Sequence, residues 1–395
     1  MSETTAQRGP RGTARLRQLN TRQVLSALRE ATRPVSIAEL AASTSLTRPT
    51  VAQIVAGLEE RRWLRRHEPI AANGRPAARY GLAHESIAVF GIDVGAHRTV
   101  VELAGLDGTT RARREARRAQ SLNAETLRAV GSMVEECLAE GGLETTGVVA
   151  GTVATPGIID PVTGSIVLRR HLGTWDAHQI SSDLARCTVG RVTVENDASL
   201  AALAMSDLPG VPASFLGLQW GQRLGAGVVL AGQVYRGRTG AAGELGSLLL
   251  PDPVTGEVSQ LEDVVRASRL PLLGGLPDLS TEELAQAAQG GDPGAQQALR
   301  RAVDALAAAV APTCLALDLQ VVTVSGAIAR CGPALTTALR DALAAHGAVG
   351  VELLLSPFLE DTVLRGAVTS ATEAGWDWLL ERCGAPGAAP VAARP

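Results

Sequence analysis

The stretch from Trp220 to Gly246 constrains the fold more than any other part of this chain, because glycine recurs in it at positions that suit turns. The apolar run Val228–Leu230 predicts a short buried strand, and Gly232 predicts a tight turn into a returning strand. The glycines of the loop that follows are Gly237, Gly240 and Gly243. Their backbone can approach a small ligand closely, and Glu244 is the only acid of the stretch. A hairpin followed by an ordinary surface loop is the alternative.

Length and composition indicate a globular protein of several domains. The chain has 395 residues, and 46% of them are hydrophobic but only 3% aromatic, so it can bury a large aliphatic interior. No apolar run reaches the roughly 18 residues of a membrane span, and the start of the chain lacks the apolar stretch of a signal peptide. We therefore expect a cytoplasmic protein. The five cysteines are scattered without a CxxC pair, which indicates reduced core thiols rather than a metal site.

The near-neutral net charge conceals an asymmetry between the two ends of the chain. All 37 basic residues are arginines, and residues 1–84 hold 14 of them against six glutamates and no aspartate. The remaining residues carry an excess of acids. A basic head on an acidic body is typical of a DNA-binding domain fused to a domain that binds a small molecule.

Residues 16–84 carry the helix-start signals of a winged helix-turn-helix. Asn20 predicts the start of a first helix. Ser36, with Glu39 three positions on, forms a capping box for a second helix. Thr47 predicts the cap of a third helix. Two short extended segments around a glycine-containing turn then predict a β-wing. An unrelated three-helix cap with a solvated arginine face is the alternative.

Five polar residues of this segment are candidates for DNA contact. The third helix of a helix-turn-helix places its N-terminal residues against base edges, and arginines of a wing reach phosphates or the minor groove. The candidates on the third helix are Arg48, Thr50 and Gln53, and those on the wing are Arg75 and Arg79. We expect this segment to bind operator DNA.

The glycine-rich stretch resembles the signature of a known family. Residues 230–237, LAGQVYRG, and residues 240–246, GAAGELG, are similar to the signature of the ROK family (repressors, open reading frames and kinases). The run GRPAARYGL at residues 74–82 is similar to the wing of that family's repressors, which include xylose and N-acetylglucosamine repressors. The resemblance implies an α/β protein with an N-terminal winged helix-turn-helix, followed by the two-lobed actin-like (ribonuclease H-like) fold of sugar kinases.

The resemblance and the residue patterns together divide the chain into five segments. These are a disordered arm (1–15), the winged helix-turn-helix (16–84), a first lobe (86–205), a second lobe (206–360) and a disordered tail (384–395). We expect a C-terminal helix at about 361–380 to pack back on the first lobe and complete it.

A sugar site is implied by further resemblance. The segment Glu195–Ser199 is similar to a family segment whose aspartate is the general base of the kinases, and Asp197 matches that residue. A carboxylate that accepts a hydroxyl proton suits sugar binding even without catalysis, so Asp197 is a vestigial base candidate. The residues implied in sugar binding are Gly157, Asn196, Asp197, Glu244, Ser247 and Glu262. The alternative for Asp197 is an ordinary helix N-cap.

The nucleotide-binding loops of the family's kinases are altered in this chain. In the first loop, Ala96 and His97 replace a glycine and a threonine. In the second, Gln222 and Arg223 replace a threonine and a glycine. Of three glycines in the adenosine loop, only Gly326 remains. A phosphate cradle needs backbone amides that no side chain obstructs, so we expect no ATP cofactor and no phosphoryl transfer.

The family's structural zinc site also lacks its ligands in this sequence. Its histidine is Ser247 here, and residues 251–257, PDPVTGE, replace its cysteine-rich run. A structural zinc needs thiolates or imidazoles. We therefore expect no bound metal, and a loop that packing alone must hold.

These observations predict a sugar-responsive transcriptional regulator without kinase activity, a repressor of carbohydrate uptake or metabolism genes. We expect it to bind operator DNA as a homodimer or homotetramer, with a sugar or sugar derivative as effector and no membrane partner. Two alternatives stay open. Asp93 and Asp197 are retained, which favours an ATP-dependent, hexokinase-type sugar kinase with an appended DNA-binding domain. Arg223 and His97 favour a regulator of anionic ligands, and the altered zinc loop favours one that binds no ligand.

Overall fold

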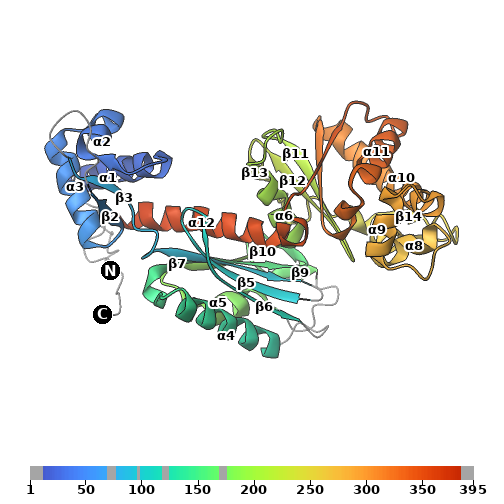
Figure 1. Cartoon of the computed structure of the whole chain (residues 1–395), viewed down its shortest axis with the longest axis horizontal. Helices are drawn as coiled ribbons and strands as arrows, with labels where there is room; N and C mark the ends of the chain where they lie inside the picture. The colour runs from blue at the N-terminus through green and yellow to red at the C-terminus, as the bar shows by residue number, and fades with distance from the viewer. Residues whose placement is uncertain (1–11, 69–76, 96–97, 118–123, 169–175, 384–395) are drawn as a thin grey trace, which may run out of the picture.

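The computed structural model shows a helical N-terminal domain and two lobes, arranged along one long helix (Figure 1). The described residues are 12–68, 77–95, 98–117, 124–168 and 176–383. The N-terminal domain lies at one end of helix α12 (Thr362–Arg382), and the first lobe lies along this helix. The predicted arm up to residue 11 and the predicted tail 384–395 lie outside the described residues.

The N-terminal domain is a winged helix-turn-helix. Its elements are α1 (Gly12–Glu30), β1 (Val35–Ser36), α2 (Ile37–Thr44), α3 (Arg48–Glu60), β2 (Leu64–His67) and β3 (Arg79–Leu82), and the strands form an antiparallel sheet in the order β1-β3-β2. Ser36 and Glu39 close the predicted capping box of α2. The Thr47 side chain accepts the Thr50 N–H and caps α3, as predicted.

The first helix differs from the prediction. α1 begins at Gly12, so residues 12–15 are helical rather than part of a disordered arm, and Asn20 lies inside the helix instead of capping it. No proline interrupts the sequence from Gly12 to the end of α1, so nothing stops the helix from extending upstream. Thr21 donates its hydroxyl to the Arg17 carbonyl at 2.9 Å, one turn back, as a threonine inside a helix does.

The first lobe is a mixed sheet with helices on both faces. Its strands are β4 (Ala88–Val94), β5 (Arg98–Gly105), β6 (Thr110–Arg117), β7 (Val148–Thr155) and β10 (Arg191–Asn196), in the spatial order β10-β7-β4-β5-β6. β4, β5 and β6 are antiparallel neighbours, whereas β7 runs parallel to β4 and β10 runs parallel to β7. Helices α4 (Ala124–Glu140) and α5 (Ala177–Leu184) cover one face, and α12 covers the other (Figure 1).

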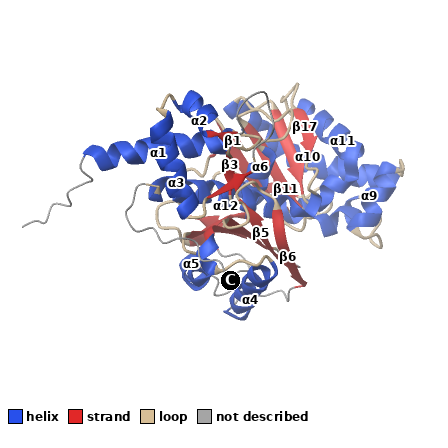
Figure 2. Cartoon of the chain, turned by 60° about the vertical axis from the view of Figure 1, so that its left-hand side comes forward, coloured by secondary structure: helices blue, strands red, loops and turns tan. Residues whose placement is uncertain are grey.

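The second lobe repeats this arrangement. Its strands are β11 (Phe215–Trp220), β12 (Leu224–Leu230), β13 (Gln233–Val234), β16 (Val321–Ser325) and β17 (Glu352–Leu355), in the order β13-β12-β11-β16-β17. Helices α9 (Thr281–Gln289), α10 (Pro293–Leu317) and α11 (Gly332–Ala345) gather on one side of this sheet (Figure 2). Helix α6 (Asp197–Met205) packs on β11 and β12 and also on α12, so it lies between the lobes.

The two sheets share one topology, which confirms the predicted fold class. In each sheet, three antiparallel strands come first in the chain, and two parallel strands are then added beside the first of them. This duplicated α/β unit, with its N-terminal helix-turn-helix, is the two-lobed actin-like, ribonuclease H-like fold. The remaining short elements are β8 (Ile158–Ile159), β9 (Ile166–Leu168), β14 (Leu249–Pro251), β15 (Val258–Gln260), α7 (Leu261–Val265) and α8 (Leu270–Leu273).

Helix α12 belongs to the first lobe and to the DNA-binding domain at once. Its N-terminal half packs on β4, β7 and α6. Gly366 permits this approach, because a Cβ there would lie 1.8 Å from the Leu200 carbonyl oxygen. Its C-terminal half shares an apolar cluster with the N-terminal domain, in which Trp63 and Trp376 are buried. The contact of this helix with the first lobe was predicted from the sequence, and its contact with the DNA-binding domain was not.

Candidate functional site

The six residues implied in sugar binding line one pocket between the two lobes. The pocket is lined by Pro156, Gly157, Asn196, Asp197, Gln219, Arg223, Leu224, Gly225, Glu244, Gly246, Ser247 and Glu262. Gly157, Asn196 and Asp197 come from the first lobe and from the start of α6, whereas Glu244 and Glu262 come from the second lobe. The fold therefore brings these residues together, and their role in sugar binding stays a prediction.

Asn196 fixes the first-lobe wall of this pocket. It ends β10 and is the N-cap of α6, because its Oδ1 accepts the Ser199 N–H at 2.9 Å. Its Nδ2 donates to the Gly157 carbonyl oxygen at 3.0 Å. The capping role considered for Asp197 thus belongs to Asn196, and Asp197 is the first residue of the helix. Since backbone groups already take one N–H and the oxygen of the Asn196 amide, one N–H remains for a ligand.

Asp197 lies deep in the pocket, and its environment favours the protonated form. Burial raises the pKa of this carboxyl above its usual value, and the nearby Glu262 acts in the same direction. The Arg223 guanidinium and the Ala198 N–H, which Asp197 accepts at 2.8 Å, oppose that rise. Asp197 can accept a hydrogen bond from a ligand hydroxyl.

The second-lobe wall follows from the glycine-rich stretch. Glu244 precedes a short 3-10 helix that ends at Ser247. Glu262, in α7, accepts the Leu224 N–H through Oε2 at 3.2 Å. Gly246 must be glycine here, because a Cβ would lie 2.6 Å from the Leu224 carbonyl oxygen. The bare backbone lets α7 and the start of β12 lie against this loop and brings the acids to one wall.

Two contacts close the lobes over the pocket. Arg236, which follows β13 in the second lobe, forms an ion pair with Glu195 at the end of β10. Gly240 lies so close to the first lobe that a Cβ would come 2.0 Å from the Ile159 carbonyl oxygen. The pocket between these contacts is small, with a volume of about 80 Å³.

Arg98 and Ser325, which lie at two of the altered nucleotide loops, are hydrogen-bonded within the protein. Arg98 opens β5 directly after the first altered loop, and its Nη2 binds Asp361 Oδ1 at 2.8 Å and the Glu360 carbonyl at 2.9 Å. Its charge is therefore used within the protein. Ala96 and His97 lie outside the described residues. In the adenosine loop, Ser325 donates its hydroxyl to the Leu218 carbonyl at 3.0 Å.

An ion pair holds the segment that replaces the family's zinc loop. Asp252 is almost fully buried, binds Arg269, and accepts the N–H groups of Val254 and Thr255. Burial opposes its ionisation, but the hydrogen bonds from Val254, Arg269 and Thr255 outweigh it and hold the pKa of Asp252 below its usual range. Within the described ranges, no cluster of three or more histidine, cysteine or acidic side chains could hold a metal ion. These residues do not fit zinc.

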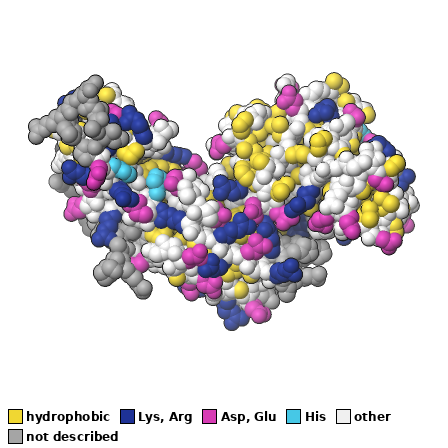
Figure 3. Space-filling model, in the orientation of Figure 1, with side chains coloured by type: hydrophobic (Ala, Val, Ile, Leu, Met, Phe, Trp, Pro, Cys, Tyr) yellow, Lys and Arg dark blue, Asp and Glu magenta, His cyan; other side chains and the backbone are white. Residues whose placement is uncertain are grey.

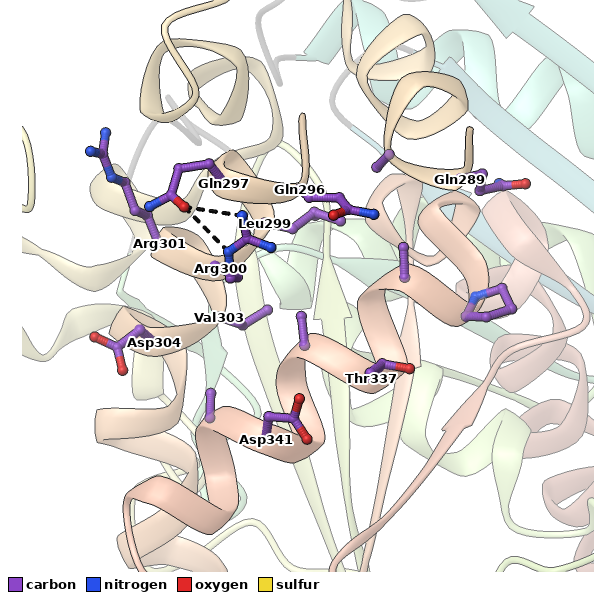
Figure 4. A pocket seen from close by; sticks show the side chains of 15 residues that line it. Gln289, Gln296, Gln297, Leu299, Arg300, Arg301, Val303, Asp304, Thr337 and Asp341 are labelled. Atoms are coloured by element: carbon purple, nitrogen blue, oxygen red, sulfur yellow. Dashed lines mark hydrogen bonds between the residues drawn. The ribbon is translucent and has the colours of Figure 1, made fainter. Parts of the chain in front are cut away.

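A larger cavity, which sequence reasoning missed, opens between α9, α10 and α11 (Figure 4). Its volume is about 880 Å³. α10 contributes Gln296, Gln297 and Arg300 to its wall, and α11 contributes Thr337 and Asp341. Part of the polar wall is satisfied internally, because the Arg300 guanidinium donates to Gln297 Oε1. No motif in the sequence marks this cavity, since its lining is spread over three amphipathic helices.

The DNA-binding candidates separate into two groups. Arg48 and Gln53 are exposed on α3, and the Thr50 hydroxyl lies 2.8 Å from that of Thr47. Arg75 lies outside the described residues. Arg79 has partners within the protein, because its Nη1 donates to the Pro34 carbonyl at 2.9 Å and pairs with Glu39 at 3.1 Å, so it braces the wing against α2. Its contact with DNA stays a prediction.

Glu39 is the acceptor that organises this brace. Its carboxylate accepts the Ser36 N–H and binds the guanidinium groups of Arg33 and Arg79. The hydrogen bond from the Ser36 backbone, followed by that from Arg33, lowers the pKa of Glu39 to about 2. The carboxylate therefore remains charged at any physiological pH. The sequence identified Glu39 as the capping-box partner of Ser36. It gave no sign of the contact between Glu39 and Arg79, which lies 40 positions away.

The DNA-binding domain docks firmly on the C-terminal half of α12. The rings of Trp63 and Trp378 have centroids 6.0 Å apart. Arg29 forms an ion pair with Glu373, and the Arg22 side chain donates to the Leu380 carbonyl at 2.9 Å. The domain and the second lobe stand at opposite ends of α12 with an open notch between them (Figure 3). Movement of α12 must therefore move the DNA-binding domain.

Comparison with known proteins fits this architecture. The ROK family model matches residues 89–369, which is more than half of the chain. The chain belongs to the ROK family. The model of the IclR helix-turn-helix domain matches residues 20–68. The chain is thus a ROK-family protein with an N-terminal helix-turn-helix domain.

Two kinases are similar to this ROK-family protein in sequence. It is 28% identical over 248 residues to the glucokinase of Thermotoga maritima, over 56% of this chain and 78% of the relative. It is 33% identical over 132 residues to the N-acetyl-D-glucosamine kinase of Vibrio cholerae, over 32% of this chain and 41% of the relative.

Solved structures resemble it over more of its length. A ROK family transcriptional regulator, a homologue of the E. coli MLC protein, has a TM-score of 0.73 at 20% identity and covers 93% of this chain and 99% of its own. A ROK family glucokinase from Streptomyces griseus, in complex with glucose and AMPPNP, has a TM-score of 0.61 at 18% identity and covers 72% of this chain and 99% of its own. At these identities the likeness shows the fold alone.

Two further findings concern the cysteines and possible membrane spans. All five cysteines are buried and unpaired. In the portion of the chain that the structure describes, no helix is long and apolar enough to cross a membrane.

Proposed function

We propose that this ROK-family protein is a DNA-binding transcriptional regulator, a repressor, that responds to a sugar or sugar derivative and transfers no phosphoryl group. One observation carries the proposal: α12 packs on the lobe that forms one wall of the pocket and also on the DNA-binding domain. A ligand in the pocket and DNA on the helix-turn-helix thus act on two ends of one rigid element.

The start of α12 is tied to both lobes, which gives a route for ligand control. Asp361 precedes the helix and binds Arg98 and Arg113 of the first lobe. The neighbouring Glu360 binds Arg330 of the second lobe at 2.8 Å. Opening or closing the lobes over a ligand must strain or rearrange these pairs. A ligand shifts DNA affinity only if it binds the two lobe arrangements unequally.

DNA recognition would use α3 and a second copy of the chain. Arg48 and Gln53 stand exposed on the face of α3 opposite its buried residues, at the end that meets base edges in helix-turn-helix domains. Such domains bind two half-sites as dimers, and the half-site spacing follows from the distance between the domains. We expect a homodimer or homotetramer on a palindromic operator, and an effector that changes this distance.

Melting of the purified protein against sugars, sugar phosphates and ATP tests the ligand side of the proposal. A ligand at about 100 times its dissociation constant adds roughly 2.7 kcal/mol to the free energy of unfolding. We expect a rise in melting temperature with a sugar or sugar derivative and none with ATP. DNA selected from a random library by the same protein should contain a two-fold symmetric site. A protein that selects no DNA sequence would contradict the proposal.

A sugar kinase is the second candidate, because Asp93 is buried at the end of β4 and Asp197 lies at the position of the kinases' base. The two curated relatives described above are kinases. The occupied Arg98 and the side chains of Gln222 and Arg223 oppose this role. Release of ADP that depends on an added sugar would overturn our preference for a regulator without enzyme activity.

A further inference from the structure

Arg223 differs from the rest of the pocket in charge and in its lack of a partner. It is the only basic residue among the described residues that line the pocket, where Asp197, Glu244 and Glu262 supply three acids. In the described structure its guanidinium makes no hydrogen bond and no ion pair, although it lies near enough to Asp197 to influence that carboxyl. Three other arginines of the second lobe form ion pairs: Arg236 with Glu195, Arg266 with Asp263 and Arg269 with Asp252.

The backbone holds Arg223 in place at the pocket. It lies in the tight turn between β11 and β12, whose ends pair as Trp220 with Leu224. The Gly221 N–H donates to the Arg223 carbonyl at 2.9 Å and closes this turn. The Leu224 N–H is already taken by Glu262. The Arg223 side chain therefore extends from a backbone turn that hydrogen bonds fix.

An unpaired guanidinium in a partly enclosed site is suited to an anion. Its planar fork offers parallel N–H donors that match the oxygens of a phosphate or a carboxylate. A neutral hydroxyl uses only one of these donors. Burial raises the pKa of Asp197, which weakens the repulsion that this carboxyl exerts on an incoming anion.

We infer that the effector is an anionic monosaccharide, a phosphate ester or a sugar acid, whose charged group binds Arg223 while its hydroxyls face Asn196, Asp197 and Glu244. This inference rests on the proposed function, since it names the ligand class of the same pocket. Arg223 belongs to the second lobe and Asp197 to the start of α6. A ligand held by both spans the cleft and fixes the lobe arrangement.

Isothermal titration calorimetry of the whole protein tests this ligand class. The probes are glucose, mannose, N-acetylglucosamine and N-acetylmannosamine, their 1-phosphates and 6-phosphates, and glucuronate. We expect at least one anionic sugar to bind roughly 10- to 100-fold more tightly than its neutral parent, the range that charge-assisted hydrogen bonds supply. Tighter binding of a sugar phosphate would identify the anionic group as a phosphate ester. Tighter binding of glucuronate would identify it as a carboxylate.

The variants Arg223→Gln and Arg223→Lys test whether Arg223 causes the preference for an anionic sugar. Arg223→Gln should lose the preference for the anionic sugar over its neutral parent, while Arg223→Lys keeps part of this preference. Arg340→Gln is the matched control, because Arg340 is exposed on α11 and away from the pocket lining. Melting curves of each variant show whether it folds.

The outcomes separate this inference from the proposed function. Tight binding of a neutral sugar with no gain for its anionic derivatives would overturn the inference and leave the sugar-responsive regulator intact. An anion preference that survives in Arg223→Gln would overturn it as well, because another group then holds the anion. Absence of binding by every neutral and anionic probe would overturn both.

Discussion

Replacement of Trp378 by alanine tests whether α12 couples the DNA-binding domain to the pocket. The Trp63 and Trp378 ring centroids lie 6.0 Å apart, and the Arg382 guanidinium carbon lies 4.7 Å from the centroid of the Trp378 ring. An aromatic pair contributes about 0.5–1.5 kcal/mol and an exposed cation–π contact about 0.5–1 kcal/mol. Loss of both weakens the docking of the domain by about 1–2.5 kcal/mol, or roughly 5- to 70-fold in the docking equilibrium.

Hydrogen exchange measures this docking. In Trp378→Ala we expect amides at the contact between α12 and the DNA-binding domain to exchange faster by that factor, while the sheets of both lobes keep their protection. The effect of a pocket ligand on DNA affinity, measured by fluorescence anisotropy, should shrink together with the protection. Asp377→Ala is the matched control, because Asp377 is the exposed neighbour on the same helix. Unchanged exchange and an unchanged ligand response in Trp378→Ala would refute coupling through α12.

Three further predictions concern packing, the replaced zinc loop and the DNA-binding surface. Gly366→Ala should lower the free energy of unfolding by about 1–3 kcal/mol, because its Cβ meets a backbone oxygen at 1.8 Å. A Cβ at Gly57 in α3 meets open space, so Gly57→Ala should raise the free energy of unfolding by about 0.5–1 kcal/mol. Equal melting temperatures of the two variants would contradict the close packing at Gly366. Asp252→Ala should cost about 2–3 kcal/mol at pH 7, discounted for the partial exposure of Arg269. Because the pKa of Asp252 is lowered, this contribution is complete above the ordinary carboxylate pKa and is lost as the pH falls through the folded-state pKa, so an equal cost at pH 7 and in acid would contradict it. Arg48→Ala should weaken DNA binding by about 1–3 kcal/mol without changing the melting temperature, whereas Arg79→Ala should lower the melting temperature of the DNA-binding domain.

Local signals in the sequence predicted much of the architecture. The capping box at Ser36 and the cap at Thr47 are interactions between residues three positions apart, so the residue types alone indicate them. The family signature supplied the two-lobed fold and the six residues that meet at the pocket. Asn20 was misread for the same local reason: a residue that suits a cap also fits inside a helix when the chain upstream remains helical.

Long-range contacts could not be predicted in this way. The ion pair between Arg29 and Glu373 joins residues 344 positions apart, and no local pattern on either side marks it. The same holds for Arg98, whose partner Asp361 lies 263 positions away. Arg79 has a partner 40 positions away, a contact that the sequence did not reveal.

The most direct test of the central claim is the affinity for selected operator DNA, measured by fluorescence anisotropy with and without a saturating ligand that binds the pocket. We predict a change of at least about 5-fold, the lower end of ordinary coupling free energies. The double variant Asp197→Asn and Glu244→Gln should keep the DNA affinity of the free protein and lose the ligand effect. Equal DNA affinity with and without a ligand that calorimetry shows to be bound would contradict the proposal that this protein is a ligand-responsive regulator.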